Sequence, residues 1–423
     1  MARRAVIIGG VRTPFVKAFR EYLKLDSIAL GVAAVGALME RYALPRREIE
    51  SIVWGGVILP GLAPNVGREI ALDLKLPPEV EAMTCTRACA TGLQAVTLAA
   101  AAIERGEYDV AIAGGSDSTS NAEIKMPQKV VHALAPVAMG GKATPGDVLG
   151  AIGKLAPFTD ILPKAPKIAE RTTGQVMGEA AEEMARRNEI PREAQDDFAV
   201  RSHHRAAAAI RSGRFDREVA ATAGVYADTM VRADTSVEKL AKLRPVFARK
   251  GTLTAGNSSP LTDGGAAVLL MSEEKARALG YTPLAAFRSW AYTGVDPADQ
   301  LLMGPALAMP KALDRAGLSL ADIDLVDLHE AFAAQVLCVL KMLGSAAFAR
   351  ARLGRSQAVG EIDPERLNVH GGSVAIGHPF GATGARMVTT MANELHAADR
   401  ETALLGICAA GGLGAAAVLE RVS

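Results

Sequence analysis

The chain has 423 residues, with 47 basic against 46 acidic side chains, 49% hydrophobic residues and only 4% aromatic residues. This balanced charge excludes a strongly basic surface for nucleic acid or an anionic membrane, and no run of about 18 uncharged apolar residues is present to span a bilayer. The four cysteines are too few for a disulfide scaffold and lack the paired spacing of a zinc site. We therefore expect a cytoplasmic protein with reduced thiols.

Strand and helix signals alternate over the first 117 residues. In chain order, hydrophobic periodicity predicts a strand over 4–10, a helix over 27–42, a strand over 52–56, an apolar helix over 84–105 and a strand over 109–114. Such alternation is typical of βαβ units. The helix over 84–105 is apolar almost all round, which predicts a buried, central position.

The alternation stops after residue 117 and returns near residue 251. Between them the composition is more charged, and amphipathic helices are predicted over 174–187 and 191–211. Strand character returns over 252–257 and 266–271. We divide the chain into an N-terminal half, an inserted, mostly helical loop domain and a C-terminal half, with the bounds 1–117 (completed by 251–275), 118–250 and 276–423.

A glycine-rich stretch from Val369 to Gly384 precedes the last predicted helix. Its sequence is VHGGSVAIGHPFGATG, and five glycines with a His-Pro pair exclude a regular helix or strand. The helical pattern over 385–396 that follows makes this stretch a shaped loop at a helix N-terminus. His378 in this loop is a candidate base.

The same pattern occurs earlier in the chain, at an offset of 382 − 90 = 292 residues. Ala90-Thr91-Gly92 corresponds to Ala382-Thr383-Gly384, and the helices and strands that follow also align. We interpret this as one αβ unit used twice. Cys89 is then the counterpart of Gly381, so Cys89 and His378 are expected to lie at equivalent helix N-termini of the two halves.

Each candidate group also has an ordinary structural interpretation. A cysteine in an Ala-rich helix is often a small buried hydrophobe, and Cys408 at a strand end is explained equally well by packing. His329 follows a predicted strand over 325–328 and is either a strand-end residue that caps the next helix with Glu330 or a second imidazole near Cys89. The zinc-protease pattern is excluded, because no second histidine follows four positions on. Against this, a helix N-terminus lowers the pKa of a thiol such as Cys89. Two thiols and an imidazole at the ends of equivalent elements favour a catalytic site.

Five segments, in order across the whole chain, resemble the thiolase signatures. They are TRACATGLQA at 86–95, GNSSPLTDG at 256–264, HEAF at 329–332, GHP at 377–379 and CAAGG at 408–412. The resemblance implies an α/β, thiolase-like duplicated five-layer α/β/α/β/α fold and thiolytic cleavage of 3-ketoacyl-CoA, or the reverse condensation. HEAF and Ala410 differ from the commonest thiolase pattern. They resemble the 3-ketoacyl-CoA thiolase (beta) subunit of the fatty-acid oxidation trifunctional complex, including its bacterial anaerobic form.

The resemblance also implies the catalytic roles. Cys89 would carry the acyl group, His378 would take its proton, and Cys408 would protonate the departing enolate and deprotonate incoming CoA. One oxyanion hole would be formed by His329 with His378, and a second by the backbone N–H groups of Cys89 and Ala410.

The substrate contacts and partners follow from the same resemblance. Arg232 would lie near the nucleotide end of CoA and Ser259 near its pantetheine. CoA is a substrate in this chemistry, and no metal or other cofactor is implied. We expect a homodimer or a dimer of dimers, paired through strands near 106–115. A larger subunit with enoyl-CoA hydratase and 3-hydroxyacyl-CoA dehydrogenase activities stays open as a partner.

Three other functions stay open. A short-chain acetyl-CoA acetyltransferase would run the condensation of acetyl-CoA. A ketoacyl synthase shares the duplicated fold, but it sets two histidines with its cysteine and lacks the CAAGG ending. A non-catalytic thioester-binding subunit would have lost one of the four catalytic side chains, and this sequence retains all of Cys89, His329, His378 and Cys408.

The segment 124–134 has irregularly alternating apolar and basic residues. It is either a solvated loop or part of an acyl tunnel or docking surface.

Overall fold

The computed structural model describes residues 3–159, 161–163 and 169–422. The chain forms two compact units, Met1–Asn121 with Ala169–Ser423, and Ala122–Ile168. Among the described residues, none of the helices combines the length and apolar character needed to cross a membrane. The predicted division at 118–250 and 276–423 stays a prediction.

The large unit is built on one mixed sheet. Its strand order is β4 (Glu81–Cys85), β3 (Ser51–Gly55), β5 (Val110–Asp117), β6 (Thr262–Ser272), β1 (Ala5–Arg12), β7 (Ala285–Gly294), β10 (Leu413–Arg421), β9 (Thr402–Ala409) and β8 (Leu325–Leu328). The short β2 (Val16–Lys17) pairs with β6. β1 and β7 share only two residue pairs, so the sheet consists of two halves joined by a narrow contact.

The two halves repeat the same strand pairing. In the first half, β3 is parallel to β5, which is antiparallel to β6, which is antiparallel to β1. In the second half, β8 is parallel to β9, which is antiparallel to β10, which is antiparallel to β7. This pairing confirms the duplicated αβ unit that the sequence predicts.

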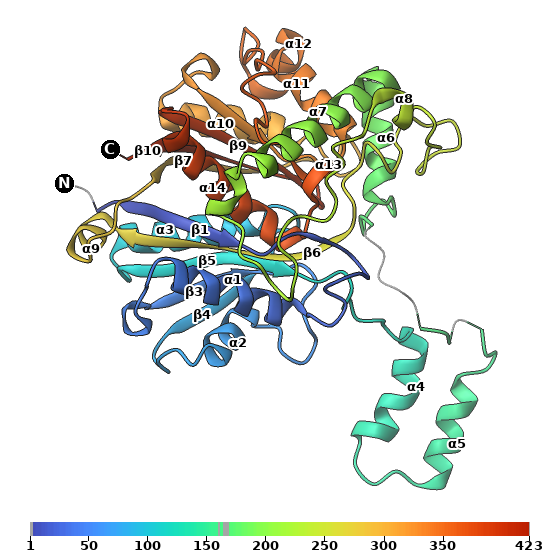
Figure 1. Cartoon of the computed structure of the whole chain (residues 1–423). Coiled ribbons are helices and arrows are strands. Elements are labelled where there is room, and N and C mark those ends of the chain that lie inside the picture. Colours follow the sequence, from blue (N-terminus) through green and yellow to red (C-terminus); the bar gives the residue numbers. More distant parts are fainter. Residues whose placement is uncertain (1–2, 160, 164–168, 423) are drawn as a thin grey trace. The chain divides into compact units, whose positions relative to one another are not determined.

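Helices fill the space between the two half-sheets and cover both outer faces (Figure 1). The central pair is α3 (Thr91–Arg105) and α14 (Phe380–Ala397), and it packs on strands of both halves. α1 (Ser27–Arg41) and α2 (Val66–Asp73) cover the first half, while α10 (Gly304–Ala316) and α11 (Ala333–Leu343) cover the second. All residues of α14 from Phe380 to Leu395 are buried, as a helix between two sheets requires. The layers are those of the predicted α/β/α/β/α fold.

The segment between β5 and β6 contains helices in both compact units. In the large unit, α6 (Met177–Arg187) and α7 (Arg192–Arg211) contact α11, and α8 (Val237–Leu240) contacts α7. In the small unit, α4 (Gln128–Met139) and α5 (Pro145–Lys154) pack against each other. Three further short helices of the large unit are α9 (Glu273–Ala278), α12 (Ala346–Phe348) and α13 (Ser373–Ile376).

Two local predictions are wrong. Residues 84–85 end strand β4, and the helix predicted from residue 84 begins only at Thr91. Residues 252–257 form a turn instead of a strand, because the Asn257 side chain accepts a hydrogen bond from the Thr254 N–H at 2.7 Å. β5 is paired on both sides and the sheet ends at β4 and β8, while the expected pairing of two copies near 106–115 stays a prediction.

Candidate active site

Cys89 lies in the tight turn that connects β4 to α3. The turn bends sharply because Ala88 has a left-handed φ of 46°. Thr91 holds it: its Oγ1 accepts a hydrogen bond from the Arg87 N–H and donates one to the Ala88 carbonyl, each at 2.6 Å. The half-buried Cys89 side chain is therefore presented just before the N-terminus of α3.

His378 lies in the equivalent turn before α14. Gly377, with φ of 98°, reverses the chain after α13, and the His378 N–H donates to Thr262 Oγ1 at 2.7 Å. The His378 ring contacts Thr383 Oγ1 through Nδ1 at 2.6 Å, and Thr383 Oγ1 donates its only hydrogen to the Pro379 carbonyl. Nδ1 must therefore carry the ring proton, which leaves the lone pair on Nε2. A base is thus prepared in the required tautomer.

His329 follows directly after β8 and is fully buried. Its backbone N–H donates to the Gly406 carbonyl at 2.8 Å, and its Nδ1 lies 3.1 Å from Ser373 Oγ. The two imidazole rings approach each other, with centroids 4.1 Å apart. A residue of the second half-sheet therefore reaches the turn that carries His378.

The three groups form one cluster. Cys89 Sγ and one ring nitrogen each of His329 and His378 all lie within 4.8 Å of one another. Among the described residues, neither Nε2 atom has a hydrogen-bond partner, although both rings are buried. Buried polar atoms normally have partners, so two such atoms beside a thiol indicate a site for a ligand or a reacting group.

Cys408 and Ala410 complete the cluster. Cys408 is a buried residue of β9, and burial first of all, then the nearby Cys89 sulfur, raises its pKa. Ala410 follows in the turn to β10, and its backbone N–H is directed to the Cys89 sulfur. All five residues predicted for catalysis are therefore brought together by the fold.

Burial dominates the protonation of both thiols. It raises the pKa of Cys89 to about 12, an effect that the N–H groups of Ala410 and Cys89 itself only partly oppose. Burial also raises the pKa of Cys408 well above its ordinary value. The expected lowering of the Cys89 pKa by the helix N-terminus is wrong, because desolvation of the thiolate outweighs it. The resting thiol is neutral and needs a base when it reacts.

Burial keeps both imidazoles neutral. It lowers the pKa of His378 to about 3, and the positive charge of Arg386 lowers it further. The pKa of His329 also lies well below its ordinary value, mainly through burial. Arg386 is itself buried and pairs with Asp327 at 2.7 Å. At neutral pH the cluster thus holds two thiols and two uncharged imidazoles.

The predicted CoA contacts lie at two different places. Ser259 is half-buried, and its N–H donates to the Ala331 carbonyl at 3.0 Å, which sets it beside the segment that follows His329. Arg232 has an exposed side chain, and its backbone N–H donates to His203 Nδ1 at 3.2 Å. Ser259 therefore adjoins the cluster, whereas Arg232 is anchored through its backbone to α7.

Comparison with known proteins agrees with this geometry. The family descriptions "Thiolase, N-terminal domain" and "Thiolase, C-terminal domain" match residues 5–274 and 281–421. The chain belongs to the thiolase family. Members of this family are acyltransferases, and the present chain is one of them.

Individual thiolases resemble this one over their whole length. A Yersinia pestis protein named 3-ketoacyl-CoA thiolase is 45% identical over 99% of this chain and 97% of its own. The structure of human mitochondrial 3-ketoacyl-CoA thiolase covers all of both chains at 28% identity, with a TM-score of 0.84. The Bacillus anthracis acetyl-CoA acetyltransferase covers 100% of this chain and 99% of its own at 32% identity, with a TM-score of 0.83.

One residue of the thiolase site was missed by the sequence prediction. Glu170 accepts a hydrogen bond from the Gly411 N–H at 3.0 Å and others from the N–H and hydroxyl of Thr172. The Gly411 N–H is adjacent to that of Ala410, so the Glu170 carboxylate holds the turn that faces Cys89. Glu170 lies 240 positions before Ala410, and no local pattern marks it.

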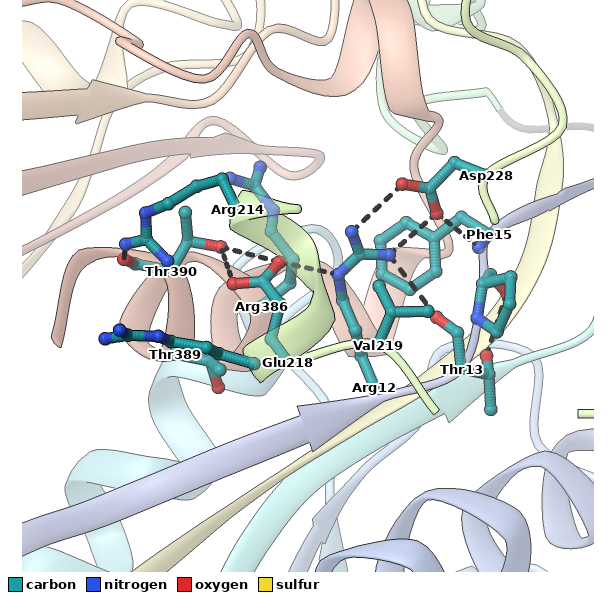
Figure 2. Close-up of polar contacts among 12 residues, drawn as sticks. Arg12, Thr13, Phe15, Arg214, Glu218, Val219, Asp228, Arg386, Thr389 and Thr390 are labelled. Atoms are coloured by element: carbon teal, nitrogen blue, oxygen red, sulfur yellow. Dashed lines mark hydrogen bonds and ion pairs between the residues drawn. The ribbon is translucent and has the colours of Figure 1, made fainter. Parts of the chain in front are cut away.

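A buried ion network supports α14 elsewhere in the thiolase fold (Figure 2). Arg12, at the end of β1, pairs with Glu218 at 2.9 Å and with Asp228 at 2.7 Å, and all three side chains are buried. Glu218 accepts a hydrogen bond from the Thr390 hydroxyl of α14, and Asp228 accepts one from the Phe15 N–H. Because the buried charges are paired and hydrogen-bonded, the network ties β1 and the chain after α7 to α14.

Proposed function

We propose that this thiolase is a 3-ketoacyl-CoA thiolase, an acetyl-CoA C-acyltransferase of fatty-acid β-oxidation. It would cleave 3-ketoacyl-CoA with CoA into acetyl-CoA and an acyl-CoA two carbons shorter. The observation that carries the proposal is the cluster of Cys89 Sγ with a ring nitrogen of His329 and of His378, all within 4.8 Å. The 45% identity to curated 3-ketoacyl-CoA thiolases supports the choice of substrate.

In the first half-reaction, Cys89 attacks the 3-keto carbon of the substrate. Its proton passes to His378 Nε2, the free lone pair of the ring whose Nδ1 is held by Thr383. The bond between C2 and C3 then breaks, which leaves the acyl group on Cys89 as a thioester and releases the enolate of acetyl-CoA. Cys408 donates the proton that turns this enolate into acetyl-CoA.

In the second half-reaction, CoA replaces the enzyme thiol. Cys408, left as a thiolate, takes the proton of the CoA thiol, and the CoA sulfur attacks the thioester carbonyl. Cys89 leaves as a thiolate and recovers its proton from His378. Each catalytic group returns to its starting protonation state, and no metal or redox cofactor takes part in the scheme.

Two oxyanions form along this route, and the cluster offers donors for each. We assign the oxygen of the acetyl-CoA enolate to His329 with His378, directly or through water. We assign the oxygen of the tetrahedral adduct on Cys89 to the N–H groups of Cys89 and Ala410. A backbone donor works equally well from Ala410 as from glycine, since the side chain takes no part. Removing one such donor typically costs about 10²–10³-fold in kcat.

The CoA contacts and the assembly belong to the same proposal. We place the pantetheine of CoA beside Ser259 and its nucleotide end near Arg232. A structure of human mitochondrial 3-ketoacyl-CoA thiolase in complex with CoA covers 100% of this chain with a TM-score of 0.83, so that complex offers a template for testing the placement. We also propose a homodimer or dimer of dimers and a hydratase–dehydrogenase subunit as partner, to be tested by mass-resolved sizing and by co-purification.

The decisive experiment traps the acyl-enzyme. The protein is incubated with a 3-ketoacyl-CoA in the absence of free CoA, digested and analysed by mass spectrometry. We expect the acyl mass on the peptide that contains Cys89, and release of that label as acyl-CoA when CoA is added. A label on Cys408 alone would reverse the assignment of the two thiols.

A chain-length series separates the proposed activity from a short-chain acetyl-CoA acetyltransferase. If a tunnel buries the acyl chain, each buried CH₂ contributes about 0.8 kcal/mol, so kcat/KM in the thiolysis direction should rise from acetoacetyl-CoA to longer 3-ketoacyl-CoA substrates. A flat or falling series would favour the acetyltransferase, which is also the name of the similar Bacillus anthracis protein.

A further inference from the structure

The catalytic cluster has the composition of a metal site as well as that of an acyl-transfer site. One thiol and two imidazoles offer ligand atoms within 4.8 Å of one another, and the two Nε2 atoms have no partner among the described residues. His329 and His378 are 0% and 4% exposed, so both unpartnered nitrogens are enclosed by protein. The reaction itself uses none of these groups as a metal ligand.

We propose that Cys89, His329 and His378 bind a zinc ion when no acyl substrate is present, and that this binding switches the thiolase off reversibly. Tetrahedral zinc with bonds of about 2.3 Å to sulfur and about 2.0 Å to nitrogen sets its ligand atoms roughly 3.3–3.6 Å apart. Since the present separations are at most 4.8 Å, the ligand atoms need to approach one another by at most about 1.2–1.5 Å. Rotations of up to about 30° about χ1, of the two histidine side chains as well as of Cys89, supply movements of that size within one rotamer well.

The surroundings orient both imidazoles for this role. Thr383 Oγ1 accepts a hydrogen bond from Nδ1–H of His378, because its own hydrogen is donated to the Pro379 carbonyl, so the Nε2 lone pair is available to a metal. Ser373 Oγ lies 3.1 Å from Nδ1 of His329. Its hydroxyl accepts a hydrogen bond from Nδ1–H when Nε2 binds zinc, and it donates one to Nδ1 when Nε2–H faces the enolate oxygen. Such outer partners fix the tautomer and direction of ligating histidines.

The ligand set favours soft and borderline metals such as zinc over hard cations. A thiolate with two imidazoles suits zinc, whereas Mg²⁺ and Ca²⁺ require oxygen ligands. Binding displaces the Cys89 proton to solvent and forms a sulfur–zinc bond, so no oxidant or reductant takes part. The three protein ligands leave a fourth position open. The bound sulfur is no longer free to attack a carbonyl, and a thioester on Cys89 in turn removes the ligand.

The test measures zinc binding directly, on the full chain and without any acyl-CoA. Competition with a chromophoric chelator should show one zinc per chain, with no displacement by excess Mg²⁺. X-ray absorption at the zinc edge should show sulfur and two imidazole ligands. Cys89→Ala and His329→Asn should each weaken zinc binding by at least about tenfold. Cys85→Ser, which changes a half-buried thiol outside the cluster, should bind zinc like the wild type.

A second measurement does not depend on the folding of a variant. Zinc should slow the alkylation of Cys89 by iodoacetamide in the wild-type chain, leave that of Cys85 unchanged, and be reversed by EDTA. Wild-type affinity in Cys89→Ala, or alkylation of Cys89 that zinc does not slow, would overturn the proposal. Because zinc binding is read without substrate, a failure of the proposed thiolase activity would not be mistaken for a failure of this site.

Discussion

Gly92 of α3 and Gly384 of α14 lie against each other's helix between the two half-sheets of the large unit, and they are equivalent positions of the internal repeat. A Cβ on Gly92 would lie 2.8 Å from the Ala385 nitrogen, and one on Gly384 would lie 2.9 Å from the Leu93 Cβ. The two helices can approach this closely only with glycine at both positions. The approach brings the turns before the two helices together, and these turns carry Cys89 and His378.

Replacing one of these glycines should destabilise the fold. Gly92→Ala forces a methyl group into the backbone of α14, and we expect a loss of about 1–3 kcal/mol in the free energy of unfolding. Gly36→Ala is the matched control, because a Cβ there meets only Leu74 Cδ2 at 3.5 Å. That change should stabilise helix α1 by about 0.5–1 kcal/mol. Urea unfolding of both variants measures the difference, and equal midpoints would contradict the packing argument.

The sequence predicts those parts of the site that depend on local patterns or on the internal repeat. Glycines at equivalent positions reveal the duplication, and the duplication alone brings Cys89 and His378 to matching helix N-termini. The periodicity also places most strands and helices within a few residues of their observed bounds. The duplication and the element bounds depend on residues close together in the sequence, so hydrophobic periodicity and glycine positions predict them.

The features that the sequence fails to predict depend on distant contacts. The helix N-terminus predicts a lowered pKa for Cys89, but burial in the assembled fold raises it. Glu170 reaches the turn at Gly411 from a segment more than two hundred residues earlier. Burial and long-range hydrogen bonds leave no periodic signal, so only the assembled fold reveals them.

The two thiols should respond differently to substitution. Cys89→Ala should lower kcat by about 10³-fold or more with the fold intact, because it removes the nucleophile but only one half-buried sulfur atom from the packing. Cys408→Ser should still form the acyl-enzyme from an activated acyl-CoA but exchange the α-protons of acetyl-CoA poorly. Deuterium exchange followed by mass spectrometry checks this. Wild-type exchange in Cys408→Ser would refute the acid–base role.

The rate of acylation should not change with pH near the ordinary pKa of histidine. Burial lowers the pKa of His378 to about 3, so the neutral ring that accepts the Cys89 proton persists as the pH falls. The acylation rate should therefore stay level from about pH 8 to about pH 5.5, across the ordinary histidine pKa of about 6.5. Single-turnover acylation at several pH values measures this. A tenfold loss centred near 6.5 would show that His378 is not desolvated.

Glu170 should control the rate of catalysis without contacting the substrate. It is 8% exposed, and its carboxylate accepts the Gly411 N–H at 3.0 Å. The hydrogen bonds it accepts, first of all that from the Thr172 N–H, lower its pKa, so it stays ionised at neutral pH. Glu170→Ala releases the turn whose Ala410 N–H faces Cys89. Because misplaced donors weaken oxyanion stabilisation, we expect kcat to fall by about 10–100-fold while KM changes little.

Two further variants separate this positioning role from a general effect on stability. Glu170→Gln keeps a side-chain oxygen that can accept the Gly411 N–H, so it should recover most of the activity that Glu170→Ala loses. Glu189→Ala removes a carboxylate that is 87% exposed and should leave kcat unchanged. Thermal unfolding of all three variants should stay within a few degrees of the wild type. A matched loss of thermal stability and activity in Glu170→Ala, with no recovery in Glu170→Gln, would instead make Glu170 a purely structural residue.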